Sequence, residues 1–280
     1  MARLKLKLHP IAILPVFFIA VFIYSAPAIS RDSASICKIP LVKTALVTKV
    51  HKDGLLQLAN GDKVRLIGIM PVKFIDNPTS LTAKKLNKLA IQAIDILRRE
   101  VKGKKVELRQ SGRARDRYNH LLAHAYGQDG KWLQGFLLQA GLARSYSYAD
   151  NHICMNNMLA LEADARREQR GLWRYRIFQP QKASQHKQLM RKHYRFTLVE
   201  GEVRKVASVK KWVFLNFGDN WRDDFTIAIE RKYKRKIEKS GLNFDSLRGK
   251  KIRVRGWVER WNGPLIKVTH KEQIELLDQK

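Results

Sequence analysis

Acidic residues are scarce in this sequence. The chain of 280 residues has 25 Asp and Glu residues against 55 Lys and Arg residues, so its formal net charge is +30. The cationic residues are spread along the whole chain and are not confined to one tail. A field of this sign favours polyanionic partners: nucleic acid, an anionic membrane surface or acidic glycans. The alternative is a general bias of the lineage toward basic proteins, and charge by itself identifies no reaction.

Long apolar runs are also missing, except at the N-terminus. Three cationic residues precede fourteen apolar residues over 11–24, and Ala26 and Ala28 follow in a small-x-small cleavage pattern. This layout predicts that residues 1–28 are a secretory signal. The alternative is an uncleaved anchor, because the uncharged stretch over 10–30 is just long enough to span a bilayer. Either way, the rest of the chain is predicted to be exported, to the periplasm or outside the cell.

Cysteine is rare, since Cys37 and Cys154 are the only two. Two thiols are too few for a structural zinc site, and no histidine stands at a spacing that would complete one. In an oxidising compartment an even pair favours a single disulfide, which here would close a long loop. The alternative is two buried, unpaired thiols.

The chain that follows is patterned as short strands and three helices. An Asn-Gly pair at 60–61 marks a hairpin turn. Pro71 lacks a backbone donor, so we expect it to end the strand in "RLIGIMPVKF". Helical spacing runs over 79–103, with Thr or Ser as the N-terminal cap, and two further helical patterns end at Gly141 and Gly171.

Residues 176–194 separate this region from a second group of strands. Between Gln169 and Val199 there are eight Lys and Arg residues and no acidic residue. The segment is therefore predicted to be a basic linker, either a strap that contacts nucleic acid or a solvated connection.

The second region, residues 195–278, is patterned as five strands with one helical segment between the third and the fourth. This order predicts an OB-type barrel. In the strand "KKIRVRGWV" apolar residues alternate with a basic face that carries a tryptophan, as a nucleic-acid platform requires. The candidate nucleic-acid-binding residues on this face are Lys251, Arg253, Arg255 and Trp257. For Trp257 core packing is an equal alternative, and for Trp212 and Phe214 on another strand it is the preferred interpretation.

Four segments carry a resemblance to a known family. They are "VRLIGI", "RARDRYNHLLAHAY", "KWLQGFLLQAGLARSYSY" and "LEADARREQRGLW". In order and spacing they resemble the staphylococcal-nuclease-like, or thermonuclease, family, within a domain over 38–175. The resemblance implies a five-stranded OB barrel with three helices that hydrolyses DNA and RNA with calcium. Residues 195–278 resemble, more weakly, an OB module that follows such domains in exported bacterial proteins. The predicted fold class is therefore mainly β with helices (α+β), with two five-stranded OB-type barrels.

The catalytic positions that the resemblance implies are matched only in part. Arg65 stands where family members place a phosphate-binding arginine. The family closes this strand with an Asp that holds the metal and a Glu proposed as general base, but this chain has Met70 and Lys73 there. His120 replaces the family's second phosphate-binding arginine. Candidate catalytic residues are therefore Arg65 and His120, by family position only.

The family's remaining metal carboxylate comes from an Asp-Gly-Asp-Thr turn, for which this chain has "KDGL" at 52–55. Asp53 is displaced by one position, and a shift of one residue turns an extended side chain to the opposite side. Calcium needs several oxygen ligands whose charge offsets its own. We therefore expect that the calcium site is lost, that no cofactor is bound, and that Arg65, with Lys73, Lys52 and His120, forms a phosphate-binding pocket.

Three functional hypotheses follow. The first is a degenerate nuclease that binds nucleic acid or another polyanion without calcium-dependent cleavage. The second is an active phosphodiesterase with a rearranged site, in which Asp53, Asp62 or Asp76 supplies a carboxylate and His120 is a general acid. The third is an interaction module of the cell envelope that stays near anionic surfaces, including membranes, through its charge. The sequence predicts no oligomeric state.

Overall fold

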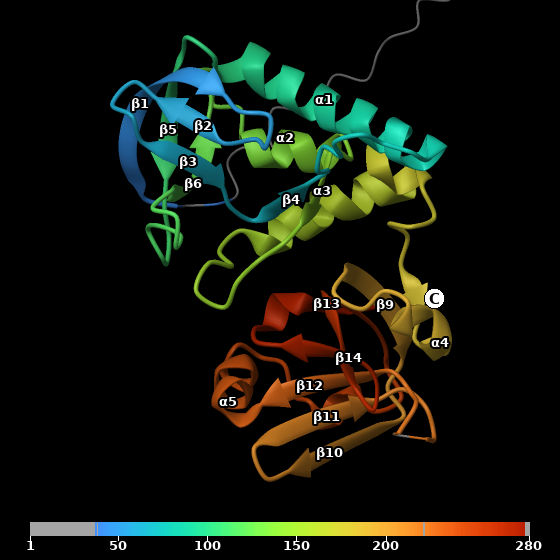
Figure 1. The fold of residues 1–280 in the computed structure, drawn as a ribbon. Coiled ribbons are helices and arrows are strands. Elements are labelled where there is room, and N and C mark those ends of the chain that lie inside the picture. The colour runs from blue at the N-terminus through green and yellow to red at the C-terminus, as the bar shows by residue number, and fades with distance from the viewer. Residues whose placement is uncertain (1–36, 38, 221, 278–280) are drawn as a thin grey trace, which may run out of the picture. The chain divides into compact units, whose positions relative to one another are not determined.

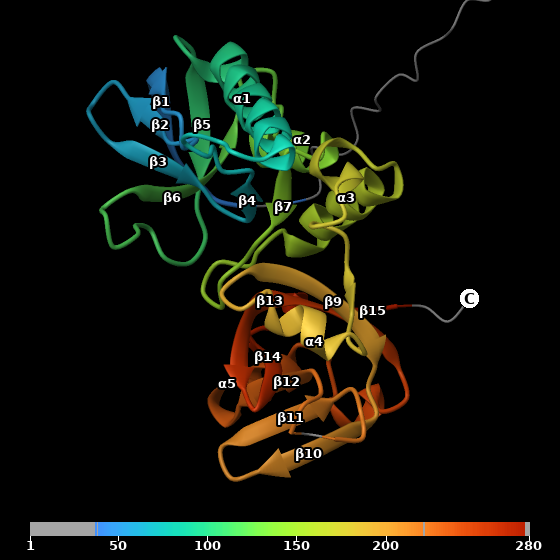
Figure 2. The ribbon, with the colours of Figure 1, turned by 45° about the vertical axis from the view of Figure 1, so that its right-hand side comes forward.

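The structure is a computed structural model that describes residue 37 and residues 39–220 and 222–277 (Figures 1 and 2). All of these belong to one compact unit, Ala34–Lys280. The predicted signal or anchor at residues 1–28 lies outside the described residues. Within the described part, no helix has both the length and the apolar character needed to cross a membrane.

A closed barrel forms the first half of the unit. Its strands, in order around the barrel, are β1 (Leu41–Val50), β2 (Leu56–Leu58), β3 (Lys63–Leu66), β6 (Leu121–Tyr126) and β5 (Lys105–Arg109). β3 and β6 are parallel, whereas the other neighbours are antiparallel. In β3, Val64 and Leu66 are buried while Lys63 and Arg65 are exposed. The alternation of side chains along a strand therefore presents Arg65 to solvent.

Three helices accompany the barrel, as predicted: α1 (Leu81–Val101), α2 (Leu133–Gln139) and α3 (Met155–Arg167). Ser80 caps α1, since its Oγ accepts a hydrogen bond from the backbone N–H of Ala83 at 3.1 Å. A short 3₁₀ helix, Gly171–Arg174, follows α3 and buries Trp173.

The strand that contains Arg65 ends earlier than predicted. β3 stops at Leu66, and the chain turns at Gly68, whose φ is +80° and whose Cβ position would overlap the Met158 side chain. It then resumes as β4 (Ile69–Pro71), which pairs with β7 (Ala143–Ser145). The ladder does end at Pro71, as expected, because Pro71 is the last residue of β4. The expectation of one unbroken strand up to Pro71 was wrong, because the chain turns at Gly68.

The second half contains a larger sheet with the same connectivity, which we call the C-terminal sheet. Its strands are β8 (Gln181–Lys182), β9 (Phe196–Glu202), β10 (Lys205–Val209), β11 (Trp212–Asn216), β12 (Thr226–Glu230), β13 (Lys251–Trp261), β14 (Gly263–Val268) and β15 (Ile274–Leu276). The order is β10-β11-β12-β14-β13-β9-β8, with β15 paired to β13. α5 (Arg231–Lys239) lies between β12 and β13, and β12 is parallel to β14. This is the OB-type order of the closed barrel, so the predicted fold class, mainly β with helices, is confirmed. The sheet has eight strands, however, where a second five-stranded barrel was predicted.

The predicted basic linker over 176–194 is not merely a solvated connection. It contains β8 and α4 (His186–Met190), and Ala183 and Leu189 are buried in the core of the C-terminal sheet. Two apolar side chains at suitable spacing are enough to fold the segment onto the sheet, despite its charge. Two further 3₁₀ helices, Asp245–Leu247 and Lys271–Gln273, complete this half.

A buried ion cluster joins the closed barrel to the C-terminal sheet. Arg255 of β13 is 1% exposed and donates to Glu162 of α3 at 3.0 Å and to Glu275 of β15 at 2.5 Å. Burial opposes its charge, but the two carboxylates hold the pKa of Arg255 above its usual value. Glu162, completely buried, also accepts from the backbone N–H of Ser145 and from Arg166. Sequence reasoning placed Arg255 on an exposed face, and the structure corrects this.

Removal of Arg255 should strongly destabilise the protein. Arg255→Met leaves Glu162 buried without its main countercharge, for which we expect a loss of about 3–5 kcal/mol in the free energy of unfolding. Urea denaturation measures it, with Lys250→Met, an exposed residue just before β13, as the control that changes stability by less than about 0.5 kcal/mol. Equal stability of the two variants would contradict the role of the cluster.

Cys37 and Cys154 are joined by a disulfide, with their Cα atoms 5.5 Å apart and a sequence separation of 117. The bond ties the segment before β1 to the start of α3. In the chain-entropy model a loop of this length adds about 4–5 kcal/mol of stability, and less in practice.

The disulfide predicts resistance to alkylation. The purified, denatured and non-reduced protein should show no mass increase with iodoacetamide, whereas prior reduction should give two adducts. Two adducts without reductant would show free thiols and refute the bond.

Candidate functional site

Arg65 is the starting point of the candidate site. Its side chain is 44% exposed, and its Nε donates to Oδ2 of Asp116 at 3.1 Å. Asp116 lies in the loop between β5 and β6. Its other oxygen, Oδ1, accepts from the backbone N–H groups of Tyr118 at 2.8 Å and His120 at 2.9 Å. The carboxylate therefore holds its own loop in shape while it orients the arginine.

His120 completes this group. Its Nδ1 lies 2.9 Å from Oδ2 of Asp116 and 3.3 Å from Nη2 of Arg65. A proton on Nδ1 satisfies the carboxylate, and Nε2 then has no hydrogen-bond partner among the described residues. The arrangement is a histidine oriented by a carboxylate beside an exposed guanidinium.

Asp116 is ionised at any ordinary pH. Burial favours the neutral acid, but the hydrogen bonds from the backbone and ring of His120, from Arg65 and from the backbone of Tyr118 outweigh it and hold its pKa at about 2. Sequence reasoning missed this residue, although it is part of "RARDRYNH". The sequence signal that could have identified it is an Asp in a predicted turn, two residues before Tyr118. An Asp side chain at such a position can accept hydrogen bonds from the backbone N–H groups that follow it.

Met70, at the first of the two positions where the resemblance implies a carboxylate, has a packing role. Met70 and Val72 pack against a buried cluster that includes Trp173 and Phe196. The Sδ of Met70 lies 3.2 Å from Nη2 of Arg144, whose Nη1 donates to the carbonyl of Phe196. Met70 therefore belongs to the packing between the closed barrel and the C-terminal sheet.

Lys73 is exposed in the segment after β4. No described contact brings it to Arg65, so the predicted pairing of these two residues at one phosphate is not observed directly.

The three alternative carboxylates are all engaged elsewhere. Asp62 pairs with Lys43 and Arg115, and Asp76 with Lys52. Asp53 accepts a hydrogen bond from the backbone N–H of Leu55. The carboxylate next to Arg65 is Asp116 and none of these three.

These residues do not fit a calcium ion. Among the described residues, no group of three or more His, Cys, Asp and Glu side chains could hold a metal. Asp116 is the carboxylate next to Arg65, and it is already bonded to Arg65 and His120. Calcium requires six to eight oxygen ligands, so the family's metal chemistry has no support in this arrangement.

The predicted basic face of β13 is largely neutralised. Lys251 is exposed, but Arg253 pairs with Glu200 and Glu275, and Arg255 is the buried residue of the ion cluster. Of the four candidates on this strand, Lys251 and Trp257 remain accessible.

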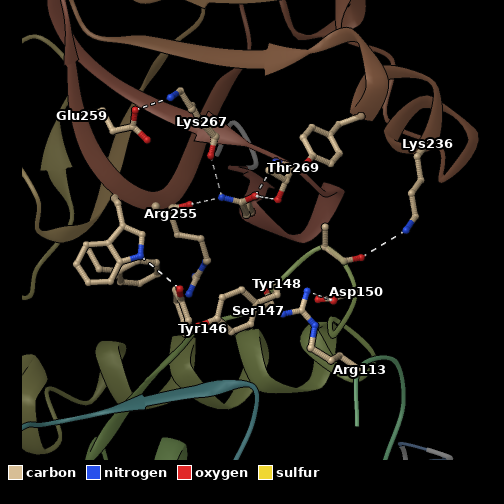
Figure 3. Close-up of a pocket in the computed structure, with 16 residues that line it drawn as sticks. Arg113, Tyr146, Ser147, Tyr148, Asp150, Lys236, Arg255, Glu259, Lys267 and Thr269 are labelled. Carbon is tan, nitrogen blue, oxygen red and sulfur yellow. Dashed lines mark hydrogen bonds and ion pairs between the residues drawn. The ribbon is translucent and has the colours of Figure 1, made fainter. Parts of the chain in front are cut away.

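Trp257 lines a pocket of about 520 Å³, shown in Figure 3. The indole is 43% exposed and its N–H donates to the hydroxyl of Tyr146 at 3.4 Å. The cations around the pocket already have partners: Arg113 pairs with Asp150, and Lys267 with Glu259. The pocket is therefore aromatic rather than strongly basic.

The Asp116 network predicts a pH-dependent contribution to stability. A carboxylate whose pKa is depressed stabilises the fold above its usual value of 3.8, and this contribution is lost as the pH falls toward about 2. Asp116→Asn should therefore cost on the order of 1–2 kcal/mol at pH 7 and clearly less at pH 2.5.

Urea denaturation at the two pH values measures this difference. Asp95→Asn, at a half-exposed position on α1, is the control and should change stability by less than about 0.5 kcal/mol. A cost of Asp116→Asn that is the same at both pH values would contradict the assignment.

Comparison with known proteins agrees with this geometry. Residues 63–175 match the family model described as staphylococcal nuclease homologue. The match begins at β3, which carries Arg65, and ends just after the 3₁₀ helix that buries Trp173. No curated protein matches the chain. Residues 63–175 of this chain therefore form a staphylococcal nuclease-like domain.

Proposed function

We propose that this protein binds nucleic acid through its phosphate groups and does not hydrolyse it with calcium. The observation that carries the proposal is that Arg65 is retained while the carboxylates that the resemblance implies for calcium are absent from the sequence. Arg65 is exposed and oriented by ionised Asp116, while Met70 and Lys73 stand where the resemblance implies carboxylates.

Arg65 is suited to phosphate. Asp116 occupies its Nε and leaves donors of the planar guanidinium for an incoming oxyanion, which such a fork binds in a bidentate way. The net charge of +30 adds a sequence-independent attraction for any polyanion. A staphylococcal nuclease-like domain supports nucleic acid as the partner in preference to a membrane surface or an acidic glycan.

Calcium-dependent cleavage is disfavoured on two grounds. Met70 is packed among apolar side chains and supplies no hard oxygen ligand. Lys73 adds a positive charge to the segment that would have to accept a divalent cation, and like charges repel most where water is partly excluded.

A second candidate function has a specific observation in its favour. The pair of Asp116 and His120 leaves Nε2 of the ring without a partner, next to the phosphate-binding Arg65. A histidine oriented by a carboxylate can transfer a proton without a metal. This is the active phosphodiesterase of the sequence analysis, with Asp116 in place of Asp53, Asp62 or Asp76.

We also propose that the protein acts after export. The three-part pattern of residues 1–28 and the single disulfide between Cys37 and Cys154 support an oxidising compartment. Either a cleaved signal or a retained anchor is compatible with this proposal.

Retention and product length together test the proposed function. The purified chain is incubated with labelled single-stranded DNA and RNA in calcium, magnesium or EDTA. We expect retention that weakens steeply with salt and no shortening of the strand in any condition. Arg65→Ala should lower the affinity about tenfold, the loss of one charge-assisted contact, whereas Arg99→Ala, which removes an exposed arginine from α1, should change it much less.

The other outcomes discriminate between the hypotheses. Shortening that requires calcium would contradict the proposal. Shortening that persists in EDTA and is lost in His120→Ala would establish the second candidate. Absence of any retention at low salt would contradict nucleic-acid binding altogether.

A further inference from the structure

A cluster of three aromatic rings lies on the C-terminal sheet, in which Trp261 is exposed and Trp212 and Phe214 are half-buried. The ring centroids of Trp212 and Trp261 are 5.2 Å apart, and those of Phe214 and Trp261 are 5.9 Å apart, both at an angle of 82°. Trp212 and Phe214 are near-parallel, with centroids 6.2 Å apart. Trp261 is 46% exposed. We call Trp212, Phe214 and Trp261 the aromatic cluster.

The strands explain why these rings face outward. In β11, Val213 and Leu215 point into the core, so Trp212 and Phe214 share the opposite face. Figure 1 shows β10, β11 and β12 side by side in the C-terminal sheet. Phe214 lies opposite Ala228 of β12, whose small side chain leaves room for a ring from elsewhere.

Trp261 supplies that ring from the end of β13. The preferred interpretation from sequence, core packing of Trp212 and Phe214, was therefore wrong. Neither residue belongs to the buried core of the C-terminal sheet. The prediction failed because alternation along a strand defines two faces and does not say which of them is covered.

The cluster is part of a larger apolar patch with a basic rim. Val209, opposite Trp212, is 52% exposed. Lys210 and Lys211 in the turn between β10 and β11 are exposed and supply this rim. Within the described part of the chain, no ion pair engages these two cations.

The acid on the neighbouring strand does not cancel this rim. Glu230, opposite Trp212, is paired with Lys232 at 2.7 Å. A contiguous apolar patch that includes the exposed Trp261 and Val209 marks a binding surface.

We propose that the aromatic cluster is a stacking site for the bases of single-stranded nucleic acid. The proposal rests on the proposed function, that the chain binds nucleic acid, and assigns it a second site on the C-terminal sheet. Bases stack on aromatic side chains irrespective of sequence, and cations beside the rings hold the phosphates between successive bases. A duplex keeps the faces of its bases covered, so the cluster selects single strands.

Charge argues against a second copy of the chain as the occupant. Two molecules of net charge +30 repel each other, and the rim of the cluster has the same sign. An anionic membrane meets the charge requirement but offers no rings to stack, and it is an outcome of the test.

The test uses the full chain and a labelled thymidine 15-mer, with the corresponding duplex for comparison, by fluorescence anisotropy. We expect Trp261→Ala and Phe214→Ala to weaken single-strand binding about 5- to 150-fold, the effect of one lost stacking contact. Trp261→Phe should keep most of the affinity, and duplex binding should not change. Leu276→Ala, another exposed apolar side chain of the same sheet at 58% exposure, is the control and should bind as the unmodified protein does.

Ultraviolet cross-linking of the unmodified protein gives an independent readout should a variant fail to fold. The oligonucleotide should attach to peptides that contain the aromatic cluster, and attachment only elsewhere overturns the proposal.

The failures are distinguishable. If Trp261→Ala and Phe214→Ala bind the single strand with the affinity of the unmodified protein, and Arg65→Ala binds it more weakly, the stacking site is overturned and the proposed function stands. If the unmodified protein binds no nucleic acid, both fall. Trp261→Ala could instead abolish binding to phosphatidylglycerol vesicles, or abolish self-association, and leave single-strand binding unchanged. The aromatic cluster would then bind the membrane or a second copy of the chain, and the proposal is overturned.

Discussion

The buried pair of Arg255 and Glu162 is the interaction on which the arrangement of this protein depends. A charge with almost no exposure to water is tolerated only with a countercharge, and here each partner comes from a different half of the unit. Glu162 also receives the backbone N–H of Ser145 in β7, the strand that pairs with β4. The electrostatic requirement of a single arginine thus connects the C-terminal sheet to the strand next to the site of the nuclease-like domain.

This connection accounts for the apolar residue at position 70, where the resemblance implies a metal-binding carboxylate. Met70 in β4 and Val72 just after it lie beside Phe196, the first residue of the C-terminal sheet after α4. The apolar neighbours of this partly buried position favour an apolar residue there. Arg65 is exposed on β3, the strand that precedes β4 along the chain, and is not subject to this constraint. The domain therefore keeps an exposed arginine at position 65, while position 70, where the resemblance implies a carboxylate, belongs to a packing interface.

Much of the fold could be predicted because the relevant signals are local. Ser80 at the start of α1 and the alternation in β3 and β13 are readable from neighbours in sequence. The candidate site was predicted in part: Arg65 and His120 are together, but Asp116, which orients both, was overlooked. A carboxylate acts here through backbone N–H groups of its own turn, and residue type alone does not reveal that geometry.

The sequence by itself determined the two OB-type patterns, the nuclease-like motifs, the excess of positive charge and the lack of carboxylates at residues 70 and 73. Only the tertiary structure decided which face of each strand is covered. Arg255 and Trp212 both alternate with core residues, yet the first is buried against Glu162 and the second is half-buried against Trp261, outside the core. The physical reason is that periodicity specifies two sides of a strand, whereas burial depends on which distant element packs against each side.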